Sequence, residues 1–208
     1  MAAGRRSTGL PDRQRWFCWA VIAVAVVALG STVGAGMALE RTEHSPLVRV
    51  GQPAPDFTLP ASFGGTVSLS EQREHAVLLA FLPSVQCGAC KTRLRRLDQA
   101  LTVLTREAVA VYAISTDEPA VQRTVASGLG LGFPLLAEDV VIGRHPAGRA
   151  YGVFHAAGPQ QGPVDAAALV VIDAGGVVRG FDTQPADQLT VSDIEALVSR
   201  ALATQGSV

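Results

Sequence analysis

Residues 76–106, AVLLAFLPSVQCGACKTRLRRLDQALTVLTR, decide the fold of this chain. An apolar run as long as a strand comes first, a short loop follows, and Cys87 and Cys90 then open a stretch with helical periodicity. A C-x-x-C pair between a strand and a helix is the layout of a thiol–disulfide redox site. The free N–H groups and the positive end of the dipole at a helix N-terminus favour thiolate over thiol. The segment therefore predicts an α/β domain with a redox-active Cys87–Cys90 pair.

The hydrophobic pattern predicts the elements on either side of this pair. Residues 76–82 are apolar without alternation, which is typical of a central strand buried on both faces. In the helix expected over 88–106, Leu94, Leu97 and Leu104 recur on one stripe. Lys91 and Arg93 lie off that stripe, where they either form a solvated face or add positive potential near a thiolate. A hairpin arm is expected at 64–69, a short extended piece at 133–136, and further strands at 109–115, 168–173 and 177–181.

Three more helices are expected. Asp117 is predicted to cap one that has Pro119 in its first turn. Residues 142–153 predict a short helix broken by Pro146 and Gly148, and Thr190 or Ser192 caps a last one. The order strand, helix, strand, helix, hairpin, helix indicates one α/β domain with a mixed sheet between helices.

Charge and cysteine content exclude several classes. The 208 residues carry a net charge of −1, so there is no basic field for nucleic acid, and none is expected as a partner. Three cysteines are too few for a small disulfide-stapled domain. Cys18, the third, lies in a different kind of segment.

That segment runs from Trp16 to Leu39 without a charge, about 36 Å at 1.5 Å per residue, which suffices to cross a bilayer. Arginines precede it and Glu40 follows it, so the positive-inside rule places the N-terminus in the cytoplasm. We expect a cytoplasmic N-terminus (1–15), a transmembrane anchor (16–39), a linker (40–49) and an extracytoplasmic redox domain (50–204) on a single-pass cell-membrane protein. A cleaved signal peptide is the rival interpretation.

Several motifs beyond the cysteine pair are typical of one superfamily. They are VGQPAPDFTL at 50–59, FPLL at 133–136, YGV at 151–153 and VID-x-x-G at 171–176. With the C-x-x-C segment they resemble the redoxin branch of the thioredoxin superfamily. That branch includes the alkyl hydroperoxide reductase/thiol-specific antioxidant proteins and the membrane-tethered thiol–disulfide interchange proteins. The resemblance implies a thioredoxin-like fold from about Val50 to Ala203.

The sequence matches the motifs of each branch only in part. Antioxidant proteins carry F-x-P-x-x-x-T-x-x-C; in FLPSVQCGAC (81–90), Cys90 falls on the peroxide-attacking position and Cys87 replaces the threonine. The arginine of that branch would fall near Ala167, where none occurs. Exchange proteins usually have W-C-G-P-C, a cis-proline near Ala167 and a buried acid near Ala80. Here the motif is QCGAC and the nearest proline is Pro163.

Three functions follow from the resemblance. The leading one is a membrane-anchored extracytoplasmic thiol–disulfide oxidoreductase, in which Cys87 attacks a substrate disulfide and Cys90 resolves the mixed disulfide. It would need a protein dithiol or disulfide as substrate and an upstream thiol electron donor. The first alternative is a peroxiredoxin-like thiol peroxidase, in which Cys90 becomes a sulfenic acid and Cys87 condenses with it.

The second alternative is a copper-binding assembly factor of the same fold, a class with C-x-x-x-C and a late histidine. The spacing here is one residue shorter, and His155 lies well before Ala168. The histidines are scattered at 44, 75, 145 and 155, and no second C-x-x-C occurs, so a zinc site is not expected. No cofactor or metal is therefore expected.

Overall fold

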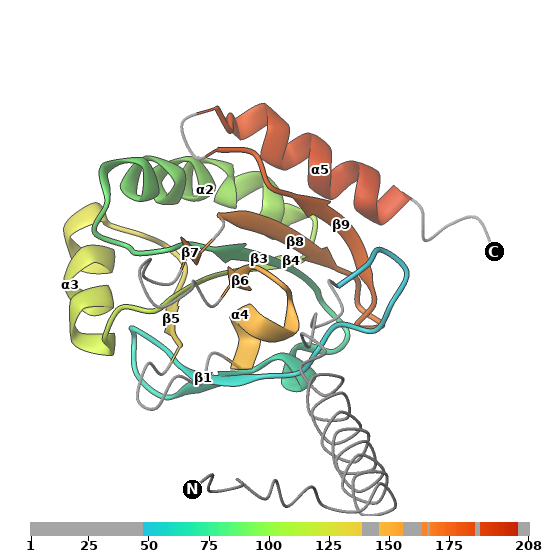
Figure 1. Ribbon diagram of the computed structural model, residues 1–208. Helices are drawn as coiled ribbons and strands as arrows, with labels where there is room; N and C mark the ends of the chain where they lie inside the picture. Colours follow the sequence, from blue (N-terminus) through green and yellow to red (C-terminus); the bar gives the residue numbers. More distant parts are fainter. Residues whose placement is uncertain (1–47, 139–145, 156–163, 166, 186–187, 204–208) are drawn as a thin grey trace, which may run out of the picture. The chain divides into compact units, whose positions relative to one another are not determined.

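The computed structural model describes residues 48–138, 146–155, 164–165, 167–185 and 188–203 (Figure 1). The expected cytoplasmic N-terminus (1–15), anchor (16–39) and most of the linker lie outside the described residues. Among the helices in those ranges, none has both the length and the apolar character needed to cross a membrane.

A five-stranded mixed sheet organises the redox domain, with strand order β5-β4-β3-β8-β9. The central strand β3 (Ala76–Phe81) is parallel to β4 (Val109–Ser115), and β4 is parallel to β5 (Leu135–Ala137). On its other side β3 pairs antiparallel with β8 (Ala168–Ile172), which pairs antiparallel with β9 (Val178–Asp182). The mixed sheet expected from the sequence is confirmed, with strand bounds that differ by one or two residues.

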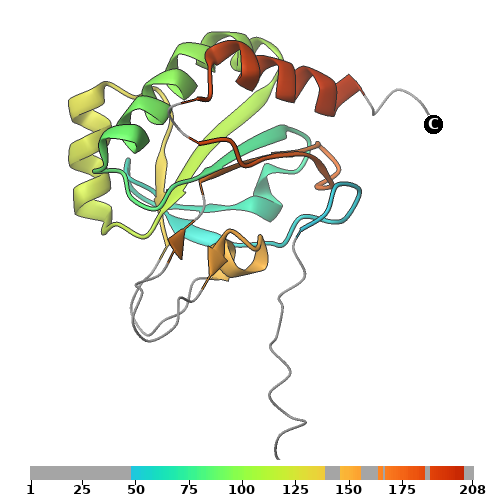
Figure 2. The same ribbon diagram turned by 45° about the horizontal axis from the view of Figure 1, so that its top comes forward.

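Two layers cover the sheet (Figures 1 and 2). Helices α2 (Gly88–Arg106) and α5 (Val191–Ala203) pack together over one face, and α3 (Pro119–Leu129) packs against β5 at the edge. On the other face lie α4 (Pro146–Ala150) and the hairpin of β1 (Thr58–Pro60) and β2 (Thr66–Ser68), which leads into the 3-10 helix η1 (Leu69–Gln72). Two short strands, β6 (Phe154–His155) and β7 (Val164–Asp165), form a separate antiparallel pair that the sequence did not predict.

The alternation of strand side chains explains why both faces are covered. In β3, Leu78 and Ala80 belong to the core under α2 and α5, whereas Val77 and Leu79 belong to the core under α4 and β1. All of these side chains are buried. Because successive strand residues point to opposite faces, a run that is apolar at every position forms two hydrophobic cores.

Helix α2 has the bounds that the sequence predicted, Gly88–Arg106. Its stripe of Cys90, Leu94, Leu97 and Leu104 is buried, as the spacing indicated. Arg93, however, is also buried, with 0 % of its side chain exposed, so the expectation of a solvated position was wrong. The segment that follows β9 lies against this part of α2, since Arg93 donates a hydrogen bond to the carbonyl of Gln184.

Helix ends show two further corrections. Residue Glu118, not Asp117, precedes α3 as its N-cap, and it makes no side-chain capping bond. Pro146 begins α4 rather than breaking it, consistent with the tolerance of helix N-termini for proline. Thr190 caps α5 as predicted: its hydroxyl accepts from the N–H of Asp193, and the Asp193 carboxylate accepts from the N–H of Thr190.

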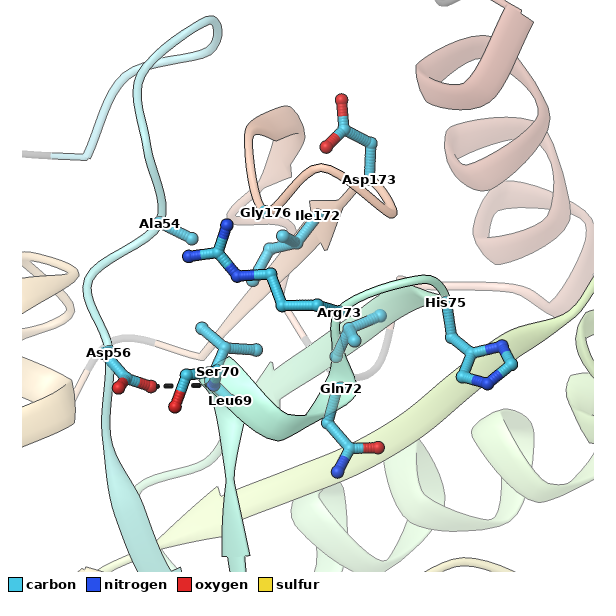
Figure 3. A pocket seen from close by; sticks show the side chains of 11 residues that line it. Ala54, Asp56, Leu69, Ser70, Gln72, Arg73, His75, Ile172, Asp173 and Gly176 are labelled. Carbon is cyan, nitrogen blue, oxygen red and sulfur yellow. Dashed lines mark hydrogen bonds between the residues drawn. The ribbon is translucent and has the colours of Figure 1, made fainter.

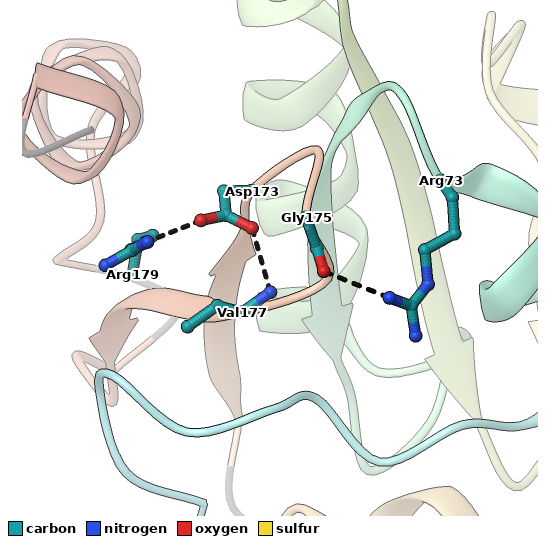
Figure 4. A network of polar contacts seen from close by, with 5 residues as sticks. All are labelled: Arg73, Asp173, Gly175, Val177 and Arg179. Atoms are coloured by element: carbon teal, nitrogen blue, oxygen red, sulfur yellow. Dashed lines mark hydrogen bonds and ion pairs between the residues drawn. The ribbon is translucent and has the colours of Figure 1, made fainter. Parts of the chain in front are cut away.

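The turn between β8 and β9 is fixed by polar contacts (Figure 4). Asp173 accepts hydrogen bonds from the N–H of Val177 at 2.9 Å and from Nε of Arg179 at 2.6 Å. From the other side, Arg73 donates to the carbonyl of Gly175 at 3.0 Å. Burial alone would raise the pKa of Asp173, but the N–H of Val177 and the guanidinium of Arg179 hold that pKa below its ordinary value.

Candidate functional site

Cys87 and Cys90 form a disulfide at the N-terminus of α2, with their Cα atoms 5.1 Å apart. Cys87 is the N-cap residue, and its Sγ accepts the N–H of Cys90 at 3.0 Å. Cys87 is exposed, whereas Cys90 is only 2 % exposed and belongs to the core under α2. The two sulfurs are therefore unequal: an incoming molecule reaches Cys87, while Cys90 is shielded.

The loop before the disulfide is held by Asp117, a residue whose part in the site was not predicted. Its carboxylate accepts from the N–H of Val85 at 2.6 Å, from the hydroxyl of Ser84 at 3.0 Å and from Nε2 of Gln86 at 3.2 Å. Parallel strands β3 and β4 end at the same edge of the sheet, so residues that follow them meet there. That rule was the signal that would have found Asp117 in the sequence.

This network continues into the protein interior. The Ser115 hydroxyl donates to Asp117 at 3.0 Å, and Nε2 of the buried Gln122 donates to the same hydroxyl oxygen at 2.9 Å. Gln122 also donates to the carbonyl of Leu136 in β5 at 2.9 Å. A chain of hydrogen bonds thus connects the active-site loop to two strands and to α3, which fixes the loop's position.

Arg93 follows Cys90 by one helical turn. Its Nη2 donates to the carbonyl of Gln184 at 3.2 Å, in the segment between β9 and α5. Its Nε and Nη1 have no hydrogen-bond partner among the described residues. Burial lowers the pKa of Arg93, while the charge of Asp182 raises it. Fully buried arginines are rare, and those that occur are normally paired.

The resemblance also pointed to the position near Ala167, where family members carry an arginine or a cis-proline. Ala167 directly precedes β8, whose Ala168 pairs with Phe81 at the end of β3, so this position is at the correct edge of the sheet but offers only a methyl group. The described peptide bonds are all trans, and Pro163 lies outside the described residues.

Among the residues described, no cluster of three or more His, Cys, Asp or Glu has a geometry that would hold a metal ion. His44 and His145 are outside them.

A small cavity lies at the opposite end of the sheet (Figure 3). Arg73, Asp56, Gln72 and Asp173 are among the residues that line it. Its volume of ≈ 10 Å³ is enough for about one water molecule. It adjoins Val77, where β3 begins, whereas the disulfide follows the strand's other end. The cavity is therefore part of the β8–β9 turn structure and separate from the redox site.

A disulfide that caps the helix after the central strand of a five-stranded mixed sheet defines a redox protein with the thioredoxin-like fold. The sequence matches the AhpC/TSA family over residues 50–181, and the chain belongs to that family. It is accordingly an oxidoreductase that acts on thiol groups.

Two proteins of Mycobacterium tuberculosis are similar to this chain in sequence. The chain is 35% identical over 139 residues to a protein of Mycobacterium tuberculosis named thiol peroxidase, covering 67% of this chain and 80% of the relative. It is 32% identical over 134 residues to alkyl hydroperoxide reductase E of the same organism, covering 64% and 84%.

Solved structures share the fold. Peroxidoxin BcpB from Mycobacterium tuberculosis superposes with a TM-score of 0.63 at 19% identity, covering 75% of this chain and 97% of that one. A reduced 2-Cys peroxiredoxin from Plasmodium vivax gives a TM-score of 0.62 at 22% identity, covering 75% and 98%.

Proposed function

We propose that this chain is a thiol peroxidase in which Cys90 reduces a hydroperoxide and Cys87 resolves the product. The observation that carries the proposal is the disulfide between the peroxide-attacking position of the family motif and the residue at the tip of α2. The relatives named thiol peroxidase and alkyl hydroperoxide reductase support it. The first alternative from the sequence is thus favoured over disulfide exchange, the leading interpretation there.

The proposed reaction has three steps. The Cys90 thiolate attacks the terminal oxygen of ROOH, the O–O bond breaks, and the leaving RO⁻ takes a proton to give ROH while Cys90 becomes a sulfenic acid. The Cys87 thiol then attacks that sulfur, forming the disulfide and releasing water. Two external thiols, by successive thiol–disulfide exchange, return both cysteines to the reduced state and leave as a disulfide.

The unequal exposure of the two sulfurs suits the last step. The external thiolate attacks Cys87, which is exposed, and Cys90, which is buried, leaves as thiolate at the helix N-terminus. The proposal requires that opening of the disulfide exposes Cys90 to a small hydroperoxide, because Cys90 is buried in the oxidised protein. The exposed Cys87 is the cysteine that an external thiol reaches.

The experiment compares wild type, Cys87→Ser and Cys90→Ser in hydroperoxide consumption driven by dithiothreitol. We expect Cys90→Ser to be inactive. In Cys87→Ser, one equivalent of hydroperoxide should convert Cys90 to a sulfenic acid that dimedone labels. Peroxide consumption by Cys90→Ser at the wild-type rate, or an unlabelled Cys90 in Cys87→Ser, would contradict the proposal.

Disulfide exchange with protein dithiols remains the second candidate function, favoured by the exposed position of Cys87 at the helix tip. Insulin reduction tests it on the same variants. In that reaction Cys87→Ser loses all activity, and Cys90→Ser accumulates a mixed disulfide through Cys87. If wild type reduces insulin faster than it consumes hydroperoxide, exchange is the main activity.

We also propose that residues 16–39 anchor the domain to the cell membrane with the disulfide on the extracytoplasmic side. The uncharged segment and the preceding arginines support this orientation. Fractionation of cells that express the full chain should place it in the membrane fraction, with the domain digested by external protease in spheroplasts. A protein that stays in the soluble fraction would contradict the proposal.

A further inference from the structure

Arg93 is the one charged group on α2 that the fold encloses completely, among the residues described. One of its nitrogens holds the carbonyl of Gln184, and two others find no partner among those residues. Leaving a charged group buried and incompletely hydrogen-bonded costs stability. A single hydrogen bond to one backbone carbonyl offsets only part of the cost of burying the guanidinium.

Cys90 lies three residues before Arg93 on the same helix, so their Cβ atoms are about 5–6 Å apart, as for any such helical pair. In the disulfide, Cys90 is neutral. After reduction it must be a thiolate to attack peroxide, yet its surroundings are the apolar core under α2, where burial favours the neutral thiol. The helix dipole opposes that effect only in part.

We propose that Arg93 is the internal counter-charge of the reduced Cys90 thiolate. It is a positioning and charge-balancing residue that acts through Cys90. In the oxidised protein Asp182 is the anion that acts on Arg93, and two of its nitrogens have no hydrogen-bond partner among the described residues. Reduction would create a second anion, the Cys90 thiolate, one helical turn away. Arg93 thereby supplies from α2 the positive charge that no arginine at Ala167 provides.

The other described charged groups around Cys90 do not supply this charge. On α2, Lys91 is only half-buried and belongs to the surface. Asp117, after β4, and Asp182, at the end of β9, are acids and oppose a thiolate. The loop of residues 83–86 has no charged side chain, and α5 faces α2 with apolar residues such as Ile194 and Leu197.

The test measures the pKa of Cys90 in a Cys87→Ser background, by thiolate absorbance at 240 nm and by the pH dependence of alkylation. We expect a value below the ordinary cysteine pKa of about 8.5. Arg93→Met should raise it by about one unit, a tenfold loss of thiolate at pH values below both. Arg93→Lys should keep most of the depression, whereas Arg95→Met, the same change at an exposed position of α2, should leave it unchanged.

Equal Cys90 titrations in Arg93→Met and Arg95→Met would overturn the inference. So would an equal rise in Arg93→Met and Arg93→Lys, because that is the pattern of a purely structural role. If Arg93→Met does not fold, the pKa of Cys90 is measured instead in the parent Cys87→Ser protein in 1 M salt. Buried charge pairs are screened little, so a depressed pKa that persists supports Arg93, and one that returns to about 8.5 contradicts it.

The inference rests on the proposed function only in taking Cys90 as the reactive thiolate. The titration needs no peroxide, so the two fail separately. A protein without peroxidase activity whose Cys90 pKa depends on Arg93 would refute the function alone. A peroxidase whose Cys90 pKa ignores Arg93 would refute this inference alone.

Discussion

Asp117 shows how one side chain determines the shape of the redox site. It was predicted to begin α3, but its carboxylate instead reaches back to the loop of residues 84–86. Three donors from that loop converge on it, including the backbone N–H of Val85 at 2.6 Å. The loop in turn fixes where Cys87 begins α2.

We predict that Asp117→Asn lowers peroxidase activity by at least about tenfold, because small displacements of reacting groups are costly. The amide presents N–H groups to donors that need an acceptor, so stability should fall by about 1.5–3 kcal/mol, the usual worth of a hydrogen bond to a charged group. Steady-state peroxide consumption and urea unfolding measure the two effects.

Glu118→Gln is the matched control, because it makes the same chemical change on the adjacent, exposed residue, which makes no capping bond. It should change neither activity nor stability appreciably. Equal behaviour of the two variants would refute the role given to Asp117.

At the scale of elements, the β8–β9 hairpin depends on one glycine. Gly176 has φ of +77°, in the left-handed region, and a Cβ there would approach Arg73 to 2.9 Å. The end of a flexible arginine moves easily, so the backbone conformation is the larger restriction. This turn lies at the end of the sheet away from the disulfide.

We predict that Gly176→Ala destabilises the protein by about 1–2 kcal/mol, the cost of a left-handed conformation for a residue with a Cβ. Urea unfolding measures the loss, and peroxidase activity in the folded protein should be unchanged because the redox site is remote.

Gly128→Ala supplies the control of opposite sign. Gly128 lies within α3, its φ is ordinary and a Cβ there would meet nothing within 4 Å. Alanine should therefore stabilise the helix by about 0.5–1 kcal/mol. A stabilising Gly176→Ala would show that the turn conformation is not required.

At the scale of the whole molecule, Glu138 connects the edge of the sheet to α4. It follows β5, is buried, and its Oε1 accepts from the N–H of Gly148 at 2.8 Å. Burial raises the pKa of Glu138, and the N–H groups of Gly148 and Ala147 offset only part of that rise. The folded protein therefore holds a proton at Glu138 more tightly than the unfolded chain does.

The sign of the pH effect follows from that difference. Above about pH 4.5, the ordinary value for glutamate, the unfolded chain loses the proton first, so stability declines as pH rises through the raised folded pKa. We predict that Glu138→Gln flattens this decline, as measured by urea unfolding between pH 4.5 and 8. Glu118→Gln should leave the decline as in wild type, and a decline that persists in Glu138→Gln would contradict the assignment.

Local patterns in the sequence were sufficient for most of the framework. The apolar run at 76–82, the stripe in 88–106 and the glycine turn before Val177 predicted strands, helix and hairpin, and the C-x-x-C pair predicted the disulfide partners. These features depend on residues close together in the chain, whose periodicity and backbone preferences act over a few positions. The family motifs added the fold, which the topology confirms.

The tertiary structure alone decided which of these residues lie together. Arg93 is buried where the segment after β9 crosses α2, and Asp117 joins the redox loop because two parallel strands end at one edge. Glu138 is buried where α4 begins. The unequal exposure of Cys87 and Cys90 has the same origin. Each of these features depends on contacts between segments that are distant in the chain. The residues next to a polar side chain in the sequence do not determine whether a distant element buries it.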